Sequence, residues 1–304
     1  MKSSTWRLGR VGGVDLLVQP STVLMGVFLV VLFAPRFEDR SDGNPYALAA
    51  TFVVALYVSV LIHELAHVFA ARRFGMRVRS VTLHLLGGET LIEGESRTPW
   101  QELAISISGP LTSLGIGIAA RSLSGSMDGT TSDILWSVGY VNILVAIFNM
   151  LPGLPLDGGR VFRAIIWQVT GREEVGIRIA AWIGRLAAVG VVAFALLAGN
   201  RDSRLGVNLL IALFVAWFLW RGAGDALRHA DRSTRINQLV ARSLVAPEQP
   251  PPDAPRLPAD LHGADLLRAM ASQPADIYAL TEVDGSVLGS LSARAVDDAY
   301  RASR

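Results

Sequence analysis

The sequence predicts an α-helical polytopic membrane protein with about six transmembrane helices. It also predicts a small membrane-associated β-hairpin or sheet and a small α+β cytoplasmic tail domain. Of the 304 residues, 51% are hydrophobic and 18% are charged, which is too apolar for an ordinary soluble domain. Apolar runs long enough to cross a bilayer recur along the chain and stop before a proline-rich stretch. We therefore expect a membrane core at 1–235, a linker at 236–258 and a tail at 259–304.

Six apolar runs are the candidate transmembrane helices. They cover residues 20–34, 47–71, 100–123, 134–151, 177–198 and 205–220. The first run is short and follows basic residues, but it lacks a small-residue cleavage site, so a transmembrane span is favoured over a removable signal peptide. In the third run, Gly109-Pro110 is expected to break the helix.

The placement of basic residues predicts the orientation of the chain. Most lie at the N-terminus and beside the ends of the second, fourth and sixth runs, and the opposite side holds only Arg36, Arg40, Arg121, Arg201 and Arg204. Because cytoplasmic loops carry an excess of Lys and Arg, both termini are expected to be cytoplasmic. We expect an integral, multi-pass protein of the lipid bilayer, in the plasma membrane of a prokaryote. No nucleic-acid-binding signature is present, and the net charge is only +2.

Two stretches outside the apolar runs have a β-like pattern. Residues 76–93 alternate in polarity and contain Gly87-Gly88, which favours a β-hairpin with a turn or bulge at the glycines. A shorter β-like stretch covers residues 14–18. His84 on the hairpin could be taken for a metal ligand, but an ordinary strand residue is the favoured interpretation.

The second apolar run contains the motif His63-Glu64-Leu65-Ala66-His67. Two histidines four residues apart share one face of a helix and can hold one metal ion, and Glu64 can act on a metal-bound water. Each ionisable group costs about 2.5–3.5 kcal/mol at the centre of a transmembrane helix, so the motif needs compensating partners. A polar cluster between helices without a metal is the alternative. The chain has no cysteine, so a metal must be held by His, Asp or Glu.

A second group of candidate residues follows the fourth run, in residues 148–160. This stretch contains two prolines and three glycines and cannot continue a regular helix. Irregular backbone at membrane depth must line protein or a wet cavity, which indicates a site. Asp157 could supply a third ligand and leave a fourth zinc position open for water, whereas Asn149 could donate a hydrogen bond to a developing oxyanion. Alternatively, Asp157 is the N-cap of a helix at 158–167.

These motifs together resemble the site-2 protease family of intramembrane zinc metalloproteases. The likeness rests on the histidine motif within a span, on Asn149, and on Leu156-Asp157-Gly158. It covers roughly residues 7–230 and extends to further positions, namely Gly87-Gly88, Glu102, Gly109-Pro110 and Asn142.

The resemblance implies a role for each residue of the site. One zinc ion per chain would be held by His63, His67 and Asp157, with Glu64 as the general base. Asn149 would steady the tetrahedral intermediate. The hairpin would present an edge strand to an unfolded substrate segment, with the contacts made by Gly87, Gly88, Glu89 and Thr90.

The expected function is therefore zinc-dependent cleavage of the transmembrane segments of membrane-protein substrates, that is, regulated intramembrane proteolysis. Zinc lowers the pKa of a bound water to about 7, and Glu64 can then take its proton. A helical substrate must unwind before cleavage, and an exposed strand edge could hold it by strand addition. A metal transporter or a non-catalytic scaffold that reuses the zinc site is the alternative. A transporter should show ligands at several depths, but here they occur only in the second and fourth runs.

The tail follows a stiff linker with five prolines between Pro250 and Pro258. The pattern predicts a helix at 264–272, strands at 277–283 and 286–291, and a helix at 293–302. This order resembles one degenerate CBS-type repeat. Such repeats normally pair, so a homodimer formed through the tail is expected. Ala295 stands where the family's nucleotide-contacting acidic residue would be, which argues against nucleotide binding. A small folded tail without a regulatory role is the alternative.

Overall fold

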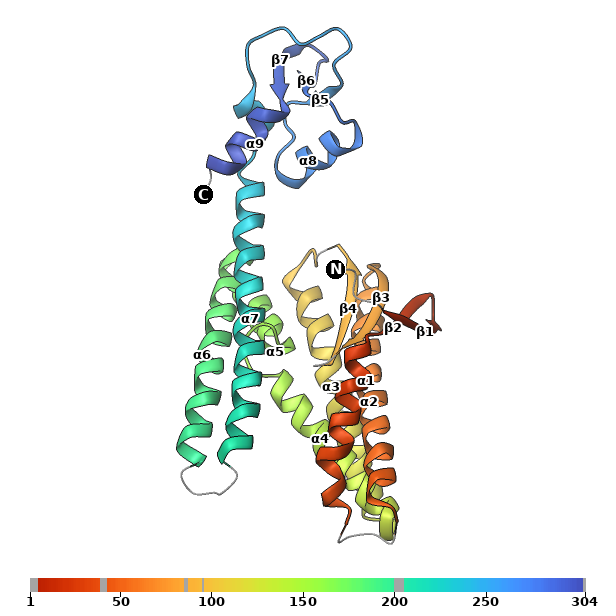
Figure 1. Ribbon diagram of the computed structural model, residues 1–304. Helices are drawn as coiled ribbons and strands as arrows, with labels where there is room; N and C mark the ends of the chain where they lie inside the picture. The colour runs from red at the N-terminus through yellow and green to blue at the C-terminus, as the bar shows by residue number, and fades with distance from the viewer. Residues whose placement is uncertain (1–4, 39–42, 85–86, 95, 200–204, 303–304) are drawn as a thin grey trace. The chain divides into compact units, whose positions relative to one another are not determined.

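The structure of the chain, a computed structural model, describes residues 5–38, 43–84, 87–94, 96–199 and 205–302 (Figure 1). The chain forms two compact units, Met1–Gly224 and Asp225–Arg304, and each is described by itself. Arg40, Arg201 and Arg204, which enter the predicted orientation, lie outside the described residues.

Five of the described helices are long and apolar enough to cross a membrane, which supports a multi-pass membrane protein. They are α2 (Pro45–Arg73), α3 (Pro99–Ser124), α4 (Gly129–Asn149), α6 (Glu173–Gly199) and α7 (Leu205–Asn237). The first apolar run forms the shorter helix α1 (Pro20–Phe33), which has 14 residues and is followed by the 3₁₀ turn η1 (Ala34–Arg36). Because about 20 residues are needed to span a bilayer, the count of six spans stays a prediction.

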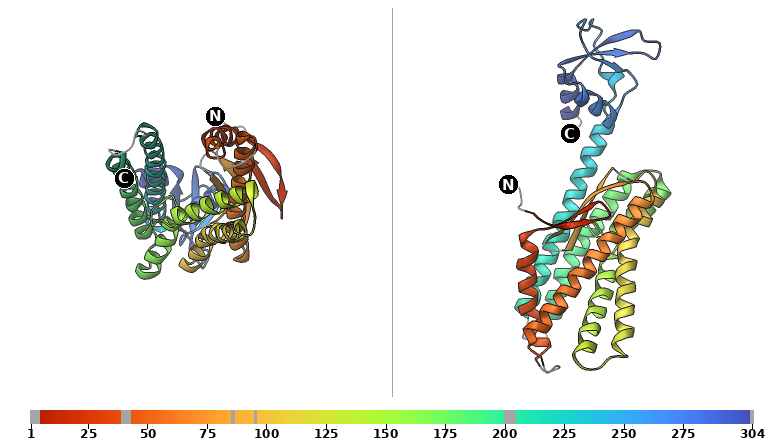
Figure 2. Two further views of the ribbon diagram at one scale, coloured as in Figure 1. Left: turned by 90° about the horizontal axis from the view of Figure 1, so that it is seen from below. Right: turned by 90° about the vertical axis from the view of Figure 1, so that its right-hand side faces the viewer.

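Helix α3 packs against α2, α4 and α5 (Asp157–Thr170). The prediction that Gly109-Pro110 breaks this helix is wrong, because α3 continues through Pro110. Proline removes only one N–H donor, and buried contacts on both sides of Gly109 and Pro110 keep the remaining turns in place. In two further views, α1 to α4 lie side by side (Figure 2).

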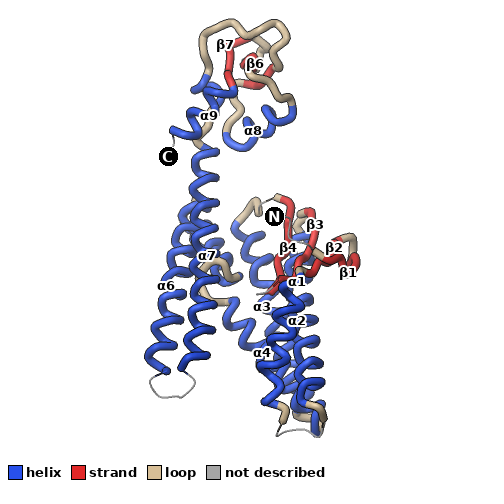
Figure 3. Tube along the Cα trace, in the orientation of Figure 1, coloured by secondary structure: helices blue, strands red, loops and turns tan. Residues whose placement is uncertain are grey.

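A four-stranded sheet lies at the end of this group of helices where α2 ends (Figure 3). It has the order β1 (Trp6–Val11), β2 (Val14–Val18), β3 (Arg77–His84) and β4 (Gly87–Glu93). Strands β2 and β3 are parallel, and the other pairs are antiparallel, which confirms the predicted hairpin as β3–β4. The buried side chains of the sheet pack against α2 and α3 through Val14, Val68, Val81 and Ile105. Strand β4 is therefore held on one side and forms an edge of the sheet.

The irregular segment 150–156 connects α4 to α5 and ends at Asp157, the first residue of α5. This segment packs closely against α5. A Cβ at Gly159 would overlap the backbone of Gly153 and Leu154, so the two stretches can approach this closely only because residue 159 is glycine. Leu154 N–H also donates to the Ala180 carbonyl of α6, at 3.1 Å. The N-cap of α5 is Leu156, so the side chain of Asp157 is not engaged as an N-cap.

The second unit contains the elements that follow α7. They are the 3₁₀ turn η2 (Ala241–Leu244), strands β5 (Arg256–Pro258), β6 (Ile277–Thr281) and β7 (Val287–Ser292), and helices α8 (Gly263–Ser272) and α9 (Ala293–Ala302). Its core includes the fully buried Leu266, Leu280 and Leu291. Leu239 and Ala241, from the segment predicted to be a linker, belong to the same core. The domain limits 1–235, 236–258 and 259–304 and the CBS-type resemblance stay predictions.

Candidate metal centre and active site

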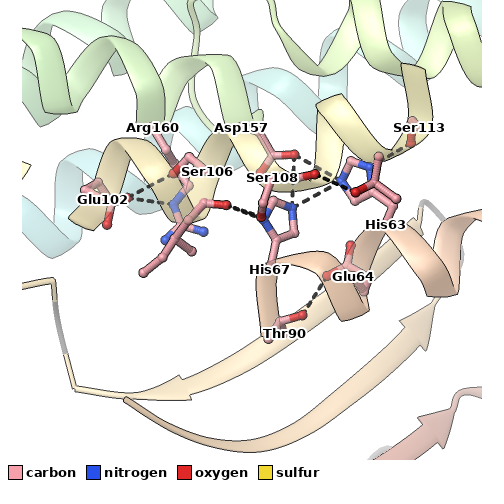
Figure 4. Close-up of polar contacts among 12 residues, drawn as sticks. His63, Glu64, His67, Thr90, Glu102, Ser106, Ser108, Ser113, Asp157 and Arg160 are labelled. Carbon is pink, nitrogen blue, oxygen red and sulfur yellow. Dashed lines mark hydrogen bonds and ion pairs between the residues drawn. The ribbon is translucent and has the colours of Figure 1, made fainter. Parts of the chain in front are cut away.

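Helix α2 presents His63, Glu64 and His67 to the protein interior. Their side chains are buried, with residue exposures of 5%, 8% and 4%. Because His63 and His67 lie one helical turn apart, their rings face the same region, and the ring centroids are 4.9 Å apart (Figure 4).

Asp157 reaches this histidine pair from α5, 94 positions along the chain from His63. Its Oδ2 lies 3.1 Å from His63 Nε2 and 3.4 Å from His67 Nε2, and the two Nε2 atoms are 3.2 Å apart. Two ligands bound to zinc at about 2.0–2.1 Å with tetrahedral angles lie about 3.3 Å from one another. The three atoms therefore match three corners of a zinc tetrahedron.

The Nδ1 atoms of His63 and His67, which face away from Asp157, each have a hydrogen-bond partner on α3. His67 Nδ1 lies 2.8 Å from the Ile105 carbonyl oxygen, and because a carbonyl can only accept, Nδ1 carries the proton. His63 Nδ1 lies 2.9 Å from Ser113 Oγ. A neutral imidazole protonated at Nδ1 directs the lone pair of Nε2 inward, which is the tautomer that binds a metal.

Gly109 of α3 lies directly against the two imidazoles. A Cβ at this position would overlap the Nε2 atoms of both His63 and His67, so only glycine fits here. Two inward lone pairs and a carboxylate oxygen so close together fit a metal ion between them.

Glu64 lies beside the three-ligand cluster and faces the hairpin. Its Oε2 accepts a hydrogen bond from Thr90 Oγ1 at 2.7 Å, and a Cβ at Gly88 would overlap the Glu64 side chain. The other two predicted substrate-contact residues, Gly87 and Glu89, are on the same strand, where Gly87 pairs with His84 and Glu89 with Thr82. Of the four, Gly88 is the one that lines the cavity described next.

A cavity of about 650 Å³ opens beside His63, Glu64 and Asp157. Asn149, the last residue of α4, lines it too, so the structure brings this predicted site residue to the same space. The rest of the lining is mainly apolar and includes Val60, Leu144, Phe148, Leu156 and Phe218. His84 also lines the cavity, but it does not belong to the group of described residues close enough to share a metal ion.

Several supporting residues had no predicted role. Ser113 and the Ile105 carbonyl orient the two imidazoles, and the only sequence signal was the polar serine within an apolar run. Glu102 belongs to the positions of the family resemblance, which implies no role for it. It is 1% exposed and accepts from Arg160 Nε at 2.9 Å, Arg163 Nη2 at 2.5 Å and Ser96 Oγ at 2.7 Å. This group ties α3 to α5 one turn after Asp157.

The fold and the site together define a class of protein: a multi-pass membrane protein with a buried His-His-Asp metal centre, an adjacent carboxylate and an apolar cavity. Comparison with known proteins agrees with this class. The model of "Peptidase family M50" matches residues 51–129 and 116–191. A Synechocystis protein named as a zinc metalloprotease is 34% identical over 251 residues, which are 80% of this chain and 65% of the relative.

A relative from Mycobacterium tuberculosis, also named as a zinc metalloprotease, is 32% identical over 306 residues, covering 96% of this chain and 75% of the relative. The solved site-2 protease from Methanocaldococcus jannaschii superposes with a TM-score of 0.54 and 27% identity, over 74% of this chain and 96% of that chain. The chain belongs to peptidase family M50, the site-2 protease family. It is a metalloendopeptidase of that family, and zinc is its cofactor.

Proposed function

We propose that the protein is an intramembrane endopeptidase that cleaves transmembrane segments of other membrane proteins, as in regulated intramembrane proteolysis. The observation that carries this proposal is the convergence of His63, His67 and Asp157 beside Glu64, at the wall of an apolar cavity. We also propose, on the distribution of basic residues, that both termini are cytoplasmic. Because the relatives named above come from bacteria and an archaeon, we propose the plasma membrane of a prokaryote as the location.

Each residue of the site has a distinct role in this proposal. His63, His67 and Asp157 hold one zinc ion, which, when bound, polarises the substrate carbonyl and makes water a nucleophile near neutral pH. Glu64 takes a proton from the attacking water and later passes it to the leaving amine. Asn149 donates a hydrogen bond to the oxygen of the scissile carbonyl as negative charge develops there.

The surroundings of the site suit an unwound hydrophobic substrate. The apolar lining of the cavity accommodates the side chains of a transmembrane segment, whereas its polar groups include His63, Glu64, His84, Asn149 and Asp157. Strand β4 is at the edge of its sheet, where an extended segment can pair with its backbone along Gly87–Thr90. A helix must unwind to do so, because its carbonyls are otherwise engaged in internal hydrogen bonds.

The test is Glu64→Gln in the purified full chain in detergent. Cleavage of a model transmembrane substrate should fall about 100-fold or more, whereas zinc should remain at one ion per chain, because Gln keeps the side-chain shape but cannot accept the proton. Glu248→Gln in the exposed segment before β5 is the matched control and should cleave normally. Cleavage by Glu64→Gln at the wild-type rate would reject the proposal and favour a transporter or scaffold that reuses the metal centre.

A further inference from the structure

We propose that Thr90 is a positioning residue for Glu64, and that β4 thereby couples substrate docking to the catalytic step. This inference rests on the proposed role of Glu64 as the general base. It assigns to the side chain of Thr90 a contact within the chain, whereas the backbone of Thr90 stays part of the proposed substrate-pairing strand.

The contacts between β4 and Glu64 are close. Thr90 Oγ1 donates to Glu64 Oε2 at 2.7 Å, and a Cβ built at Gly88 would come within 2.8 Å of Glu64 Oε1. Gly88 and Thr90 are two residues apart and so share one face of the strand. The carboxylate therefore lies against this face, with one oxygen bound by the hydroxyl and the other beside the glycine that lines the cavity.

This arrangement restricts a flexible side chain. A glutamate has several rotatable bonds, whereas threonine is branched at Cβ and has few χ1 rotamers in a strand. Holding Oε2 at a stiff donor leaves Oε1 as the oxygen that can take a proton from water in the cavity. Because small misplacements of reacting groups cost up to about 100-fold in rate, a fixed orientation of Glu64 has kinetic value.

The same strand is the one that can receive the substrate. Among the residues that the structure describes, β4 pairs with β3 alone, and its backbone groups on the other side are available for strand addition. An added strand would fix the backbone of β4, and with it the position of the Thr90 hydroxyl. Substrate binding and orientation of the base are thus linked through a single hydrogen bond.

The test compares Thr90→Val with wild type in the full chain, using the model transmembrane substrate. Valine keeps the branched shape but removes the donor, so kcat should fall about ten- to hundredfold while KM and zinc content stay unchanged. Thr90→Ser restores a hydroxyl and should recover most of kcat. Thr82→Val on β3 is the matched control, because Thr82 pairs with Glu89 and belongs to the other face of the sheet.

Three results would overturn the inference. They are a wild-type kcat for Thr90→Val, a raised KM with unchanged kcat, which would assign Thr90 to the substrate, and a loss that Thr90→Ser does not recover. Glu64→Gln in the same assay separates the two proposals. If Glu64→Gln is inactive and Thr90→Val is normal, only the positioning role fails. If Glu64→Gln is active, the proposed function itself fails.

Discussion

Two buried polar clusters meet at helix α5, one turn apart. The metal cluster consists of His63, His67 and Asp157, and the ionic cluster consists of Glu102, Arg160 and Arg163. Figure 4 shows the metal cluster together with Glu102 and Arg160. Asp157 and Arg160 are only three residues apart, so α5 contributes to both. Both clusters lie between packed helices, where a polar group costs free energy to bury unless it has a partner.

The clusters differ in how their charges are balanced. In the ionic cluster, the Glu102 carboxylate receives donors from two guanidinium groups and a serine, so the chain itself supplies the compensation. In the metal cluster, two ring nitrogens and a carboxylate oxygen lie within 3.4 Å of one another, and a metal ion bound between them satisfies all three. A cluster whose acceptors all have donors within the chain holds helices together. A cluster of acceptors without such donors is suited to binding a cation.

The largest expected effect comes from Asp157→Ala. It removes one of three ligands from the metal cluster, so zinc affinity should fall by more than about 100-fold and cleavage should be lost. The ionic cluster should still hold α5, and the melting temperature of the zinc-free protein should change little. Metal analysis after dialysis, together with thermal unfolding in detergent, measures both quantities. Retention of one zinc per chain would show that Asp157 is not a ligand.

Glu102→Ala should lower the melting temperature more than it lowers zinc affinity, which is the reverse of the effect expected for Asp157→Ala. Removing the Glu102 carboxylate leaves Arg160 and Arg163 without their shared partner, and breaking a fully buried pair costs about 3–5 kcal/mol of stability. The loss here should be smaller, because both arginines are partly exposed and Arg163 keeps Glu173 at 3.7 Å. Zinc affinity should fall less than in Asp157→Ala, because all three ligands remain. Glu102→Gln keeps an acceptor and should be milder. An unchanged melting temperature for Glu102→Ala would contradict the structural role of the ionic cluster.

The smallest effect on cleavage is expected for truncation after Asn237, the last residue of α7. Every residue of the metal centre and the cavity lies in the first unit, so the cleavage rate should stay within about twofold of the full chain. We propose in addition that the tail forms a homodimer, so the truncated protein should be monomeric by light scattering when the full chain is dimeric. An identical oligomeric state for both would reject tail pairing.

Much of this architecture was predictable because it is encoded in neighbouring residues. Apolar runs set the long helices, alternation set β3 and β4, and the four-residue spacing placed His63 and His67 on one helical face. The pairing with Asp157 could also be anticipated, since ionisable groups in an apolar segment require partners and the stretch after α4 cannot be helical. The family resemblance supplied the remaining roles.

The prediction for Gly109-Pro110 failed because a local rule for proline ignores the packing of α3 against α2, α4 and α5. The partners of Glu64, His63 and Glu102, namely Thr90, Ser113 and Arg160 with Arg163, were likewise not evident from sequence. Each of these contacts joins segments that are distant along the chain.

The sequence by itself determined the helices, the hairpin and the spacing of the histidine motif, because these depend on residues within a few positions of one another. Only the tertiary structure decided that Asp157 lies 3.1 Å from His63 and that β4 holds Glu64. Such contacts depend on how closely helices and strands pack, down to the missing Cβ atoms of Gly88 and Gly109. The distance of closest approach between helices and strands depends on the packing of the whole fold, and no local pattern of residues specifies it.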